Sequence, residues 1–279
     1  MSAVARIEGV ERGCRSLFIS DVHLGSGHCH ASELADMLAR IPHRQLFLVG
    51  DIVDLWWMSS RRAVWDSGAS RLVECLHELA RGGVELTYIP GNHDRPIRRF
   101  VGLGLPQMQI RRRVIHETAD GRRLLVTHGD EFDAVTRMGG WQEWLGDRLY
   151  DRILAGNRMA NQLRARLGMR YWSLADFVKR QSGAAERYIA RFADAGIDAV
   201  RRRGLDGIIC GHIHRAELRL VDGLIYANDG DWVESLTALA ERPDGSLELL
   251  HAGAGIEYLS RLPARQRPAP TPGRLAAAA

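Results

Sequence analysis

The stretch Gly91-Asn92-His93-Asp94 decides which fold this sequence predicts. It follows a run from Val84 to Ile89 whose β-branched and aromatic side chains predict a strand. Four other polar motifs occupy comparable places along the chain: Asp21-Val22-His23, Gly50-Asp51-Ile52-Val53-Asp54, His128-Gly129-Asp130 and Gly211-His212-Ile213-His214. Nearly every motif comes directly after a short apolar run, so we expect the ends of five strands to bring these polar side chains to one edge of a sheet.

The polar side chains of the five motifs form a mixed set of metal ligands. Carboxylate and amide oxygens together with imidazole nitrogens suit Mn²⁺, Fe²⁺ or Zn²⁺ better than Ca²⁺ or a structural thiolate site. Two metal ions that share one carboxylate form the usual site for phosphate-ester hydrolysis. We predict that Asp51 is the shared carboxylate and that the other ligands divide as follows: Asp21, His23 and His214 on one metal, and Asn92, His128 and His212 on the other.

Spacing along the chain assigns the remaining roles. In an extended backbone, Asp21 and His23 point to the same side. Asp54 lies three residues after Asp51, so we expect it to orient a histidine rather than to bind metal. His93 follows a predicted ligand and is placed to donate a proton to the leaving oxygen or to stabilise the phosphorane, with Asp54 holding its ring.

Each motif alone has a purely structural explanation. An Asp-x-His pair is structural far more often than not, and a Gly-Asn-His-Asp sequence is often only a turn. His212 and His214 reach two adjacent metals only if the backbone turns between them, which the loop beginning at Gly211 permits. Five such motifs in one order, each at a strand end, favour the functional explanation.

Length and composition are those of an ordinary globular protein of 279 residues, with 46% hydrophobic and 26% charged side chains. A net charge of +4 and a pI of about 9.1 favour anionic partners, although solubility explains the charge equally well. The four cysteines form no CxxC pair, and we interpret them as reduced thiols of a cytoplasmic protein. We also expect no signal peptide and no membrane-spanning run.

The pattern of elements predicts an α/β fold. Three strand–helix or strand–loop units in the first half favour a parallel sheet, and hairpin turns at Asp120-Gly121, Asp222-Gly223 and Asp244-Gly245 favour antiparallel pairing in the second half. We therefore predict an α/β/β/α sandwich of two mixed sheets with outer helices. The predicted divisions are an N-terminal extension 1–15, a metal-binding domain 16–136 and 204–252, a helical insertion 137–203, and a tail 253–279 that is disordered at its proline-rich end.

The predicted insertion holds thirteen arginines and one lysine against seven acids, interleaved with tryptophan and tyrosine. An arginine-rich solvated face over a small core is one explanation. The other is a cap over the metal edge that binds an anionic amphiphile or rests on an anionic membrane surface, with Arg170 and Trp172 as candidate substrate contacts. Trp56 and Trp57, near the predicted site, are candidates to stack a base or hold an acyl chain, although core packing explains at least one of the nearby tryptophans.

Taken together, the five motifs resemble those of the calcineurin-like metallophosphoesterase superfamily. Within it the chain is most similar to the UDP-2,3-diacylglucosamine diphosphatase family of lipid A biosynthesis, through Ile19 to Leu24, Leu48 to Asp51, Thr127 to Asp130, and Asn228 to Trp232. The resemblance implies two Mn²⁺ ions, a peripheral membrane habit on the cytoplasmic face of the inner membrane, and a helical cap that cradles acyl chains. One position departs from it, because His93 stands where the best-known members have arginine, and this bears on the substrate rather than on the reaction class.

Three functions follow as hypotheses. The first is hydrolysis of UDP-2,3-diacylglucosamine, or a related nucleotide-linked lipid, to 2,3-diacylglucosamine 1-phosphate and UMP. The second is a metallophosphodiesterase or nuclease, in which the arginine-rich segment contacts a phosphate backbone. The third is a membrane-binding protein without catalysis, which the complete ligand set argues against. We expect a phosphoester substrate and no nucleic-acid partner.

Overall fold

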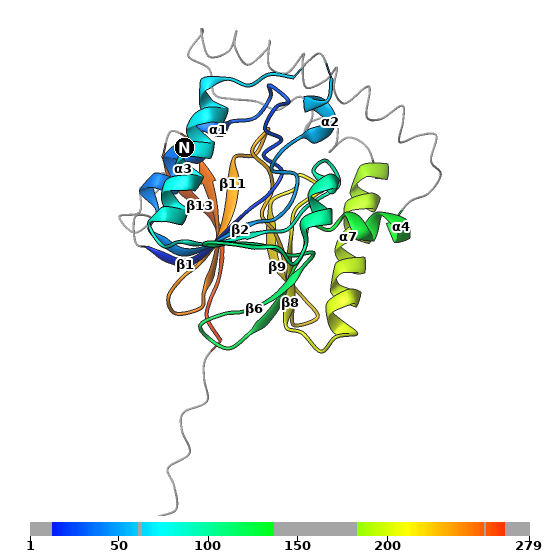
Figure 1. Cartoon of the computed structure of the whole chain (residues 1–279). Coiled ribbons are helices and arrows are strands. Elements are labelled where there is room, and N and C mark those ends of the chain that lie inside the picture. The colour runs from blue at the N-terminus through cyan, green and yellow to red at the C-terminus, as the bar shows by residue number, and fades with distance from the viewer. Residues whose placement is uncertain (1–12, 61–62, 137–182, 254, 266–279) are drawn as a thin grey trace, which may run out of the picture.

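The computed structural model describes residues 13–60, 63–136, 183–253 and 255–265, and these form a four-layered sandwich. Two sheets pack face to face, α1 and α3 cover the outer face of the first sheet, and α7 covers the outer face of the second (Figure 1). The predicted α/β/β/α sandwich of two mixed sheets is therefore confirmed.

The first sheet has eight strands in the order β13-β12-β11-β1-β2-β3-β5-β4. Their bounds are β1 Cys14–Ile19, β2 His43–Leu48, β3 Glu85–Tyr88, β4 Gly104–Leu105, β5 Met108–Ile110, β11 Thr237–Glu241, β12 Leu247–Ala252 and β13 Ile256–Leu262. Strands β1, β2, β3 and β5 pair in parallel, and β11 joins β1 antiparallel. The carboxyl ends of the parallel strands, where the predicted ligands follow, therefore meet at one edge.

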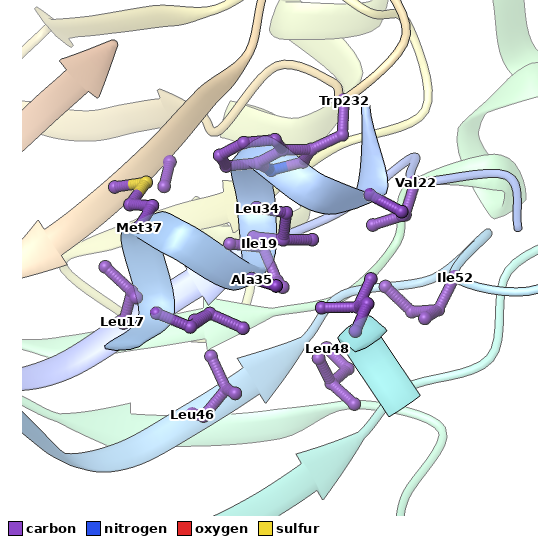
Figure 2. Packing of buried hydrophobic residues seen from close by; sticks show 14 of the residues in the cluster. Leu17, Ile19, Val22, Leu34, Ala35, Met37, Leu46, Leu48, Ile52 and Trp232 are labelled. Carbon is purple, nitrogen blue, oxygen red and sulfur yellow. The ribbon is translucent and has the colours of Figure 1, made fainter. Parts of the chain in front are cut away.

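Two helices pack on this sheet because each has one apolar face. In α1 (Ala31–Arg40) the buried residues recur every three or four positions, and Figure 2 shows Leu34 and Met37 of this face over Leu17 and Ile19 of β1. Helix α3 (Ser67–Arg81) begins at Asp66, whose side chain accepts a hydrogen bond from the Ala69 N–H at 2.9 Å. The apolar spacing in the sequence predicts helices from Ser32 to Arg40 and from Ser70 to Arg81, so the structure moves their starts by one and three residues.

The second sheet has five strands in the order β6-β7-β8-β10-β9, with bounds β6 Val114–Glu117, β7 Arg123–Val126, β8 Gly207–Cys210, β9 Glu217–Val221 and β10 Leu224–Asn228. The hairpins β6–β7 and β9–β10 are antiparallel, as their turns predict. An entirely antiparallel second half is wrong, because β8 pairs in parallel with both β7 and β10. The connection from β7 to β8 runs through a helix, which is the crossover that parallel pairing requires.

That crossover helix is α7 (Gly183–Arg201), and its position corrects the predicted C-terminal boundary of the insertion. Phe192, Ile197 and Val200 on α7 are at most 2% exposed and pack against β8 and β10. Residues 183–201 are therefore an outer layer of the sandwich and not part of a cap over the metal edge. The other helices predicted within 137–203 lie outside the described residues.

The C-terminal boundary of the sandwich is also later than predicted. Strand β13 pairs antiparallel with β12 over Ile256 to Leu262, so the domain does not end at residue 252. The side chains of β13 alternate between half-buried and exposed, which is the pattern of an edge strand with one covered face. The proline-rich end of the predicted tail lies outside the described residues.

Two further features concern the cysteines and the length of the helices. All four cysteines are free thiols in the described structure, as their spacing predicts. Of the helices that the structure describes, none combines the length and the apolar character needed to cross a bilayer.

Candidate metal centre

Each predicted ligand follows the carboxyl end of a strand. Asp21 follows β1, Asp51 follows β2 and Asn92 follows β3, whereas His128 follows β7 and the two histidines at 212 and 214 follow β8. The first three strands lie side by side in one sheet and the other two lie side by side in the second. The site therefore spans the carboxyl ends of strands in both sheets, and the expectation of one edge of a single sheet is wrong.

The backbone at the site is strained. Five of the seven predicted ligands have a positive φ, between 51° and 71°: Asp21, His23, Asp51, His212 and His214. The left-handed region costs a residue other than glycine about 1–2 kcal/mol, and such residues gather at functional sites. The extended Asp21-x-His23 geometry expected from the sequence is therefore wrong, since both residues turn sharply. The same turning at His212 and His214 directs these two side chains to different groups.

Hydrogen bonds between loops hold these turns. The Asp21 N–H donates to the Gly50 carbonyl at 3.0 Å, and the His23 N–H donates to the Asp51 carbonyl at 2.9 Å. The His212 N–H donates to Asp21 Oδ2 at 2.8 Å. Each loop is thus fixed by the loop of a neighbouring strand, which offsets the local strain.

A first group of ligand atoms comes from Asp21, His23 and His214, and these atoms lie within 4.8 Å of one another. Nε2 of His214 lies 3.2 Å and Nε2 of His23 lies 3.8 Å from Asp21 Oδ1. Asp21 Oδ1 and His23 Nε2 are buried and have no hydrogen-bond partner in the described structure. Buried polar atoms are nearly always paired, so two unpaired ones that converge fit a cation between them.

A second group comes from Asp51, His128 and His212, again within 4.8 Å. His128 Nε2 lies 3.3 Å from Asp51 Oδ2 and 3.2 Å from Asn92 Oδ1. The His128 Nδ1–H donates to the Val49 carbonyl at 2.8 Å, which leaves Nε2 free for a metal. Asp51 Oδ2 also lies 4.0 Å from His23 Nε2, so this carboxylate lies between the two groups.

Close packing around the two groups leaves no room for side chains at two glycines. A Cβ at Gly91 would lie 2.2 Å from Asp51 Oδ1, and a Cβ at Gly50 would lie 2.3 Å from His128 Nδ1. Gly50 also has a φ of 90°. The glycines of Gly50-Asp51 and Gly91-Asn92 are therefore required for the approach of the loops and not only for turning.

Asp54 connects the first group to the predicted acid. Its Oδ2 lies 3.1 Å from His23 Nδ1 and 3.0 Å from His93 Nδ1. Because an ionised carboxylate only accepts, both rings carry their proton on Nδ1 and keep Nε2 free. Oδ1 of Asp54 accepts from the Trp57 N–H at 2.8 Å, so the same residue begins helix α2 (Leu55–Met58).

Two carboxylates behind the histidines were not predicted from the sequence. Asp133, at the start of α4 (Asp133–Thr136), has Oδ1 2.9 Å from His212 Nε2, and it also accepts from the Tyr188 hydroxyl on α7 at 2.8 Å. Asp231 has Oδ1 3.9 Å from His214 Nδ1. Nothing local in the sequence marks either residue as a partner of a histidine, since the contact from Asp133 to His212 spans 79 positions.

Asp94 supports the loop that carries Asn92 and His93. It accepts hydrogen bonds from the Ile52 N–H at 3.0 Å, from the Gly91 N–H and from the Tyr88 hydroxyl at 2.6 Å. Burial, together with the neighbouring Asp51, raises the pKa of Asp94 above its usual value. The last residue of the Gly-Asn-His-Asp motif is therefore a brace and not a ligand.

The electrostatics of the two groups favour a cation. Burial opposes ionisation of Asp21, but His214 and His128 hold the pKa of its carboxyl well below the usual value, and His128 and His23 do the same for Asp51. Burial lowers the pKa of His23, yet its contacts with Asp21 and Asp54 outweigh this and raise the pKa to about 10. The carboxylates thus attract positive charge, which a divalent ion supplies in place of protons.

The structure describes two of the four predicted substrate contacts. Trp56 is 60% exposed, and its ring lies 4.8 Å from that of His93 at an angle of 36°, so it faces the site from α2. Trp57 is half-buried, with its ring 6.1 Å from that of His28. Arg170 and Trp172 lie outside the described residues.

Comparisons with known proteins found a matching family and similar sequences. The model of the calcineurin-like phosphoesterase family matches residues 14–216. A UDP-2,3-diacylglucosamine hydrolase of Xanthomonas campestris pv. campestris (strain B100) is 30% identical over 252 residues, which are 82% of this chain and 96% of the relative. A protein with the same name from Porphyromonas gingivalis (strain ATCC BAA-308 / W83) is 33% identical over 122 residues, 41% of this chain and 45% of the relative.

Among solved structures, vacuolar protein sorting 29 from Cryptosporidium parvum is similar to 90% of this chain and to 98% of its own, at 12% identity and a TM-score of 0.46.

Proposed function

Because the chain belongs to the calcineurin-like phosphoesterase family, we propose that it hydrolyses the pyrophosphate bond of a nucleotide-linked lipid with the help of two divalent ions. The protein is a metal-dependent phosphohydrolase. The proposed substrate is UDP-2,3-diacylglucosamine or a close relative, and the products are then 2,3-diacylglucosamine 1-phosphate and UMP. Mn²⁺ is the proposed metal, with Fe²⁺ or Zn²⁺ as alternatives that the same oxygen and nitrogen ligands accept.

One observation carries the two-metal part of this proposal. Asp51 Oδ2 lies between the two groups, 3.3 Å from His128 Nε2 of the second group and 4.0 Å from His23 Nε2 of the first. We assign one ion to Asp21, His23, His214 and Asp51, and the other to Asp51, Asn92, His128 and His212. Bound there, two ions would stabilise the attacking and leaving oxygens of an in-line displacement.

The chain itself supplies a candidate proton donor. The Asp54 carboxylate holds His93 by Nδ1, so Nε2 faces away from Asp54 and is available to the substrate. The His93 N–H donates to Asp51 Oδ1 at 2.8 Å, which fixes the His93 backbone to the shared ligand. His93 is therefore positioned to hold a proton at the leaving oxygen or to contact the charged phosphoryl oxygens.

The substrate class rests on relatives and on one aromatic side chain. The curated relatives are named for a nucleotide-linked diacyl sugar, and the two described above are 30% and 33% identical to this chain over the aligned residues. Trp56, exposed over His93, offers a face on which a base or a sugar ring can stack. We propose that residues 137–182 add the remaining contacts, with Arg170 and Trp172 among them, and that the protein acts at the cytoplasmic face of an anionic membrane.

A substrate panel tests the proposal. Purified protein loaded with Mn²⁺ is assayed on UDP-2,3-diacylglucosamine, on UDP-sugars without acyl chains, and on single-stranded DNA. Preferred hydrolysis of the acylated substrate, with UMP as a product, supports the proposal, and preferred cleavage of DNA replaces it with the nuclease alternative. Metal analysis completes the test, because a protein that binds fewer than two ions under turnover conditions contradicts the two-metal assignment.

A further inference from the structure

A charged surface lies at the edge of the first sheet, next to the loop that carries Asn92 and His93. The segment 95–113 contains six arginines and no aspartate, glutamate or lysine. It begins with the 3-10 helix η1 (Arg95–Phe100), passes through the edge strand β4, and ends just before β6. We call its exposed arginines and large apolar side chains the basic edge, which comprises Arg95, Arg99, Phe100, Val101, Leu103, Arg111, Arg112 and Arg113.

Three large apolar side chains of the basic edge are exposed between the arginines. Phe100 is 54%, Leu103 is 48% and Val101 is 38% exposed. They follow one another at a turn in which the Leu103 N–H donates to the Phe100 carbonyl at 2.9 Å. Folding does not bury these side chains, so their exposure needs a reason other than the core.

The arginines around this apolar tip are free to face solvent. The Gly102 N–H donates to the Ile110 carbonyl at 3.0 Å, which places the tip beside Arg111. Within the described structure, Arg95, Arg99 and Arg112 have no ion pair, and Arg111 contacts only the Gln109 side-chain oxygen, at 3.0 Å. Arg112 and Arg113 line a pocket with Asp130 and Glu131, so the charge without nearby acids is that of Arg95, Arg99 and Arg111.

The basic edge is rigidly connected to the metal centre. Arg98, at its base, donates to the Pro90 carbonyl at 3.1 Å and to both oxygens of Asp130, at 2.7 and 2.8 Å. Pro90 precedes the loop of Asn92, and Asp130 lies two residues after His128. A partner bound at the basic edge is therefore held at a fixed position next to the mouth of the site.

From these features we propose that the basic edge is a docking surface for an anionic lipid bilayer. Arginines around a small apolar tip match a bilayer surface, because the tip enters the acyl boundary while the guanidinium groups contact anionic headgroups. A nucleic acid would match the charge and could stack one base on Phe100, but it would gain nothing from Val101 and Leu103, whereas a bilayer accepts all three side chains. The proposal rests on the proposed function only in explaining why a lipid-linked substrate would be presented beside the metals.

Vesicle binding tests this proposal without catalysis. The full chain is sedimented with vesicles of phosphatidylcholine, with and without phosphatidylglycerol, in the absence of substrate. We expect binding only to the anionic vesicles, and binding that weakens as salt is added. Arg99→Gln with Arg111→Gln should weaken binding about 20–30-fold, at roughly fivefold for each basic side chain. Phe100→Ser with Leu103→Ser should weaken it about tenfold or more.

Matched variants elsewhere on the surface are the controls. Arg44→Gln with Arg81→Gln removes the same charge from another part of the surface, and Leu220→Ser with Leu259→Ser removes equally exposed apolar side chains, at 57% and 52%. At about 0.1 M salt, charges more than about 10 Å apart are largely screened, so each control pair should change vesicle binding by less than about twofold. Thermal melting confirms the fold of each variant.

Three results would overturn the proposal: no binding of the wild type to anionic vesicles, equal losses in the control pairs, or binding of a labelled oligonucleotide in place of vesicles through Arg99 and Arg111. Loss of hydrolysis with vesicle binding intact would count against the proposed function alone.

Discussion

The two ends of the sandwich each bury carboxylates against histidines, but they do so differently. At the end opposite the metal centre, Glu241 of β11 is fully buried and lies 2.6 Å from His116 Nε2 of β6. It also accepts from Arg15 Nη1, from the Ser16 hydroxyl, and from the Ala119 N–H, so both oxygens have donors. This group joins the two sheets, and nothing in it is left unpaired.

The metal centre lacks this saturation. Asp21 Oδ1 and His23 Nε2 are buried without a partner in the described structure, and five of the seven predicted ligands have a positive φ. A buried network whose polar atoms all have hydrogen-bond partners makes a fold rigid. A buried network with unpaired atoms and strained backbone costs stability, and such networks cluster at functional sites. The comparison therefore separates structural from functional carboxylates without reference to their residue type.

Replacing the shared carboxylate should give the largest effect. Asp51→Ala removes a ligand from both groups, so hydrolysis should fall to background and the bound metal should fall to one ion or none. Metal analysis and turnover of a chromogenic phosphodiester measure this. Asp222→Ala, an exposed aspartate paired with Arg201, is the matched control and should retain both. An Asp51→Ala protein that binds two ions and keeps normal turnover would contradict the assignment of Asp51 as the shared ligand.

His93→Ala should have a smaller effect of a different kind. Both ions should remain, while turnover should fall about 10²–10⁴-fold, the usual contribution of a positioned acid or base. The loss should be largest for a phosphodiester with a poor, alkoxide leaving group and should shrink for a nitrophenolate leaving group, which needs no proton. If the variant loses an ion instead, His93 is a ligand, and its contact with Asp54 has been misinterpreted.

Asp133 tests whether a residue behind a histidine matters in the same way. Asp133→Ala should weaken the second ion by about 10–100-fold, because His212 loses the carboxylate that holds its Nε2 and directs its other nitrogen to the metal. Asp133→Asn, which keeps an acceptor, should recover part of the loss, and Tyr188→Phe should cost less than either. Titration with Co²⁺ followed by absorbance separates the two sites. Equal weakening of both ions would indicate general loosening rather than positioning of His212.

Much of the fold and site follows from local sequence patterns. The three parallel strands, the helices on their outer face and the hairpin turns are short-range features, and the ligands follow directly at strand ends. For this reason the sequence places all seven predicted ligands at the strand ends that the structure brings together. Their roles as ligands remain a prediction that the metal titrations above address.

The errors in the sequence-based prediction have physical causes. The positive φ at Asp21 and His23 cannot be read from residue type, since only a few per cent of residues other than glycine have it, even though aspartate and histidine are enriched among them. Asp133 and Tyr188 meet His212 only through folding, from positions far apart in the chain. The assignment of α7 to a cap did not take into account its apolar face, which contains Phe192. Strand β13 was not predicted because it is followed by a proline-rich stretch, which led us to interpret the whole segment as a tail.

The smallest catalytic effect is expected at the saturated end, where Glu241→Gln should change stability and not activity. Burial raises the pKa of Glu241, but His116 and Arg15 outweigh this and hold the pKa below its usual value of 4.5. An acid whose pKa is lower in the folded state contributes stability above the unfolded pKa, and this contribution is lost as the pH falls through the folded pKa.

Urea unfolding at neutral pH should therefore show Glu241→Gln to be less stable by about 2–3 kcal/mol, because one carboxylate oxygen becomes an amide that faces donors. The difference from wild type should shrink as the solution is acidified, since the wild-type carboxyl then loses its own charge. Turnover per folded molecule and the two bound ions should stay within about twofold of wild type, because no step of the hydrolysis uses this end of the sandwich. Glu257→Gln, an exposed glutamate on β13, should change neither quantity. A loss of metal or turnover in folded Glu241→Gln protein would show that the two ends are coupled, and saturation of hydrogen bonds would no longer distinguish a structural carboxylate from a functional one.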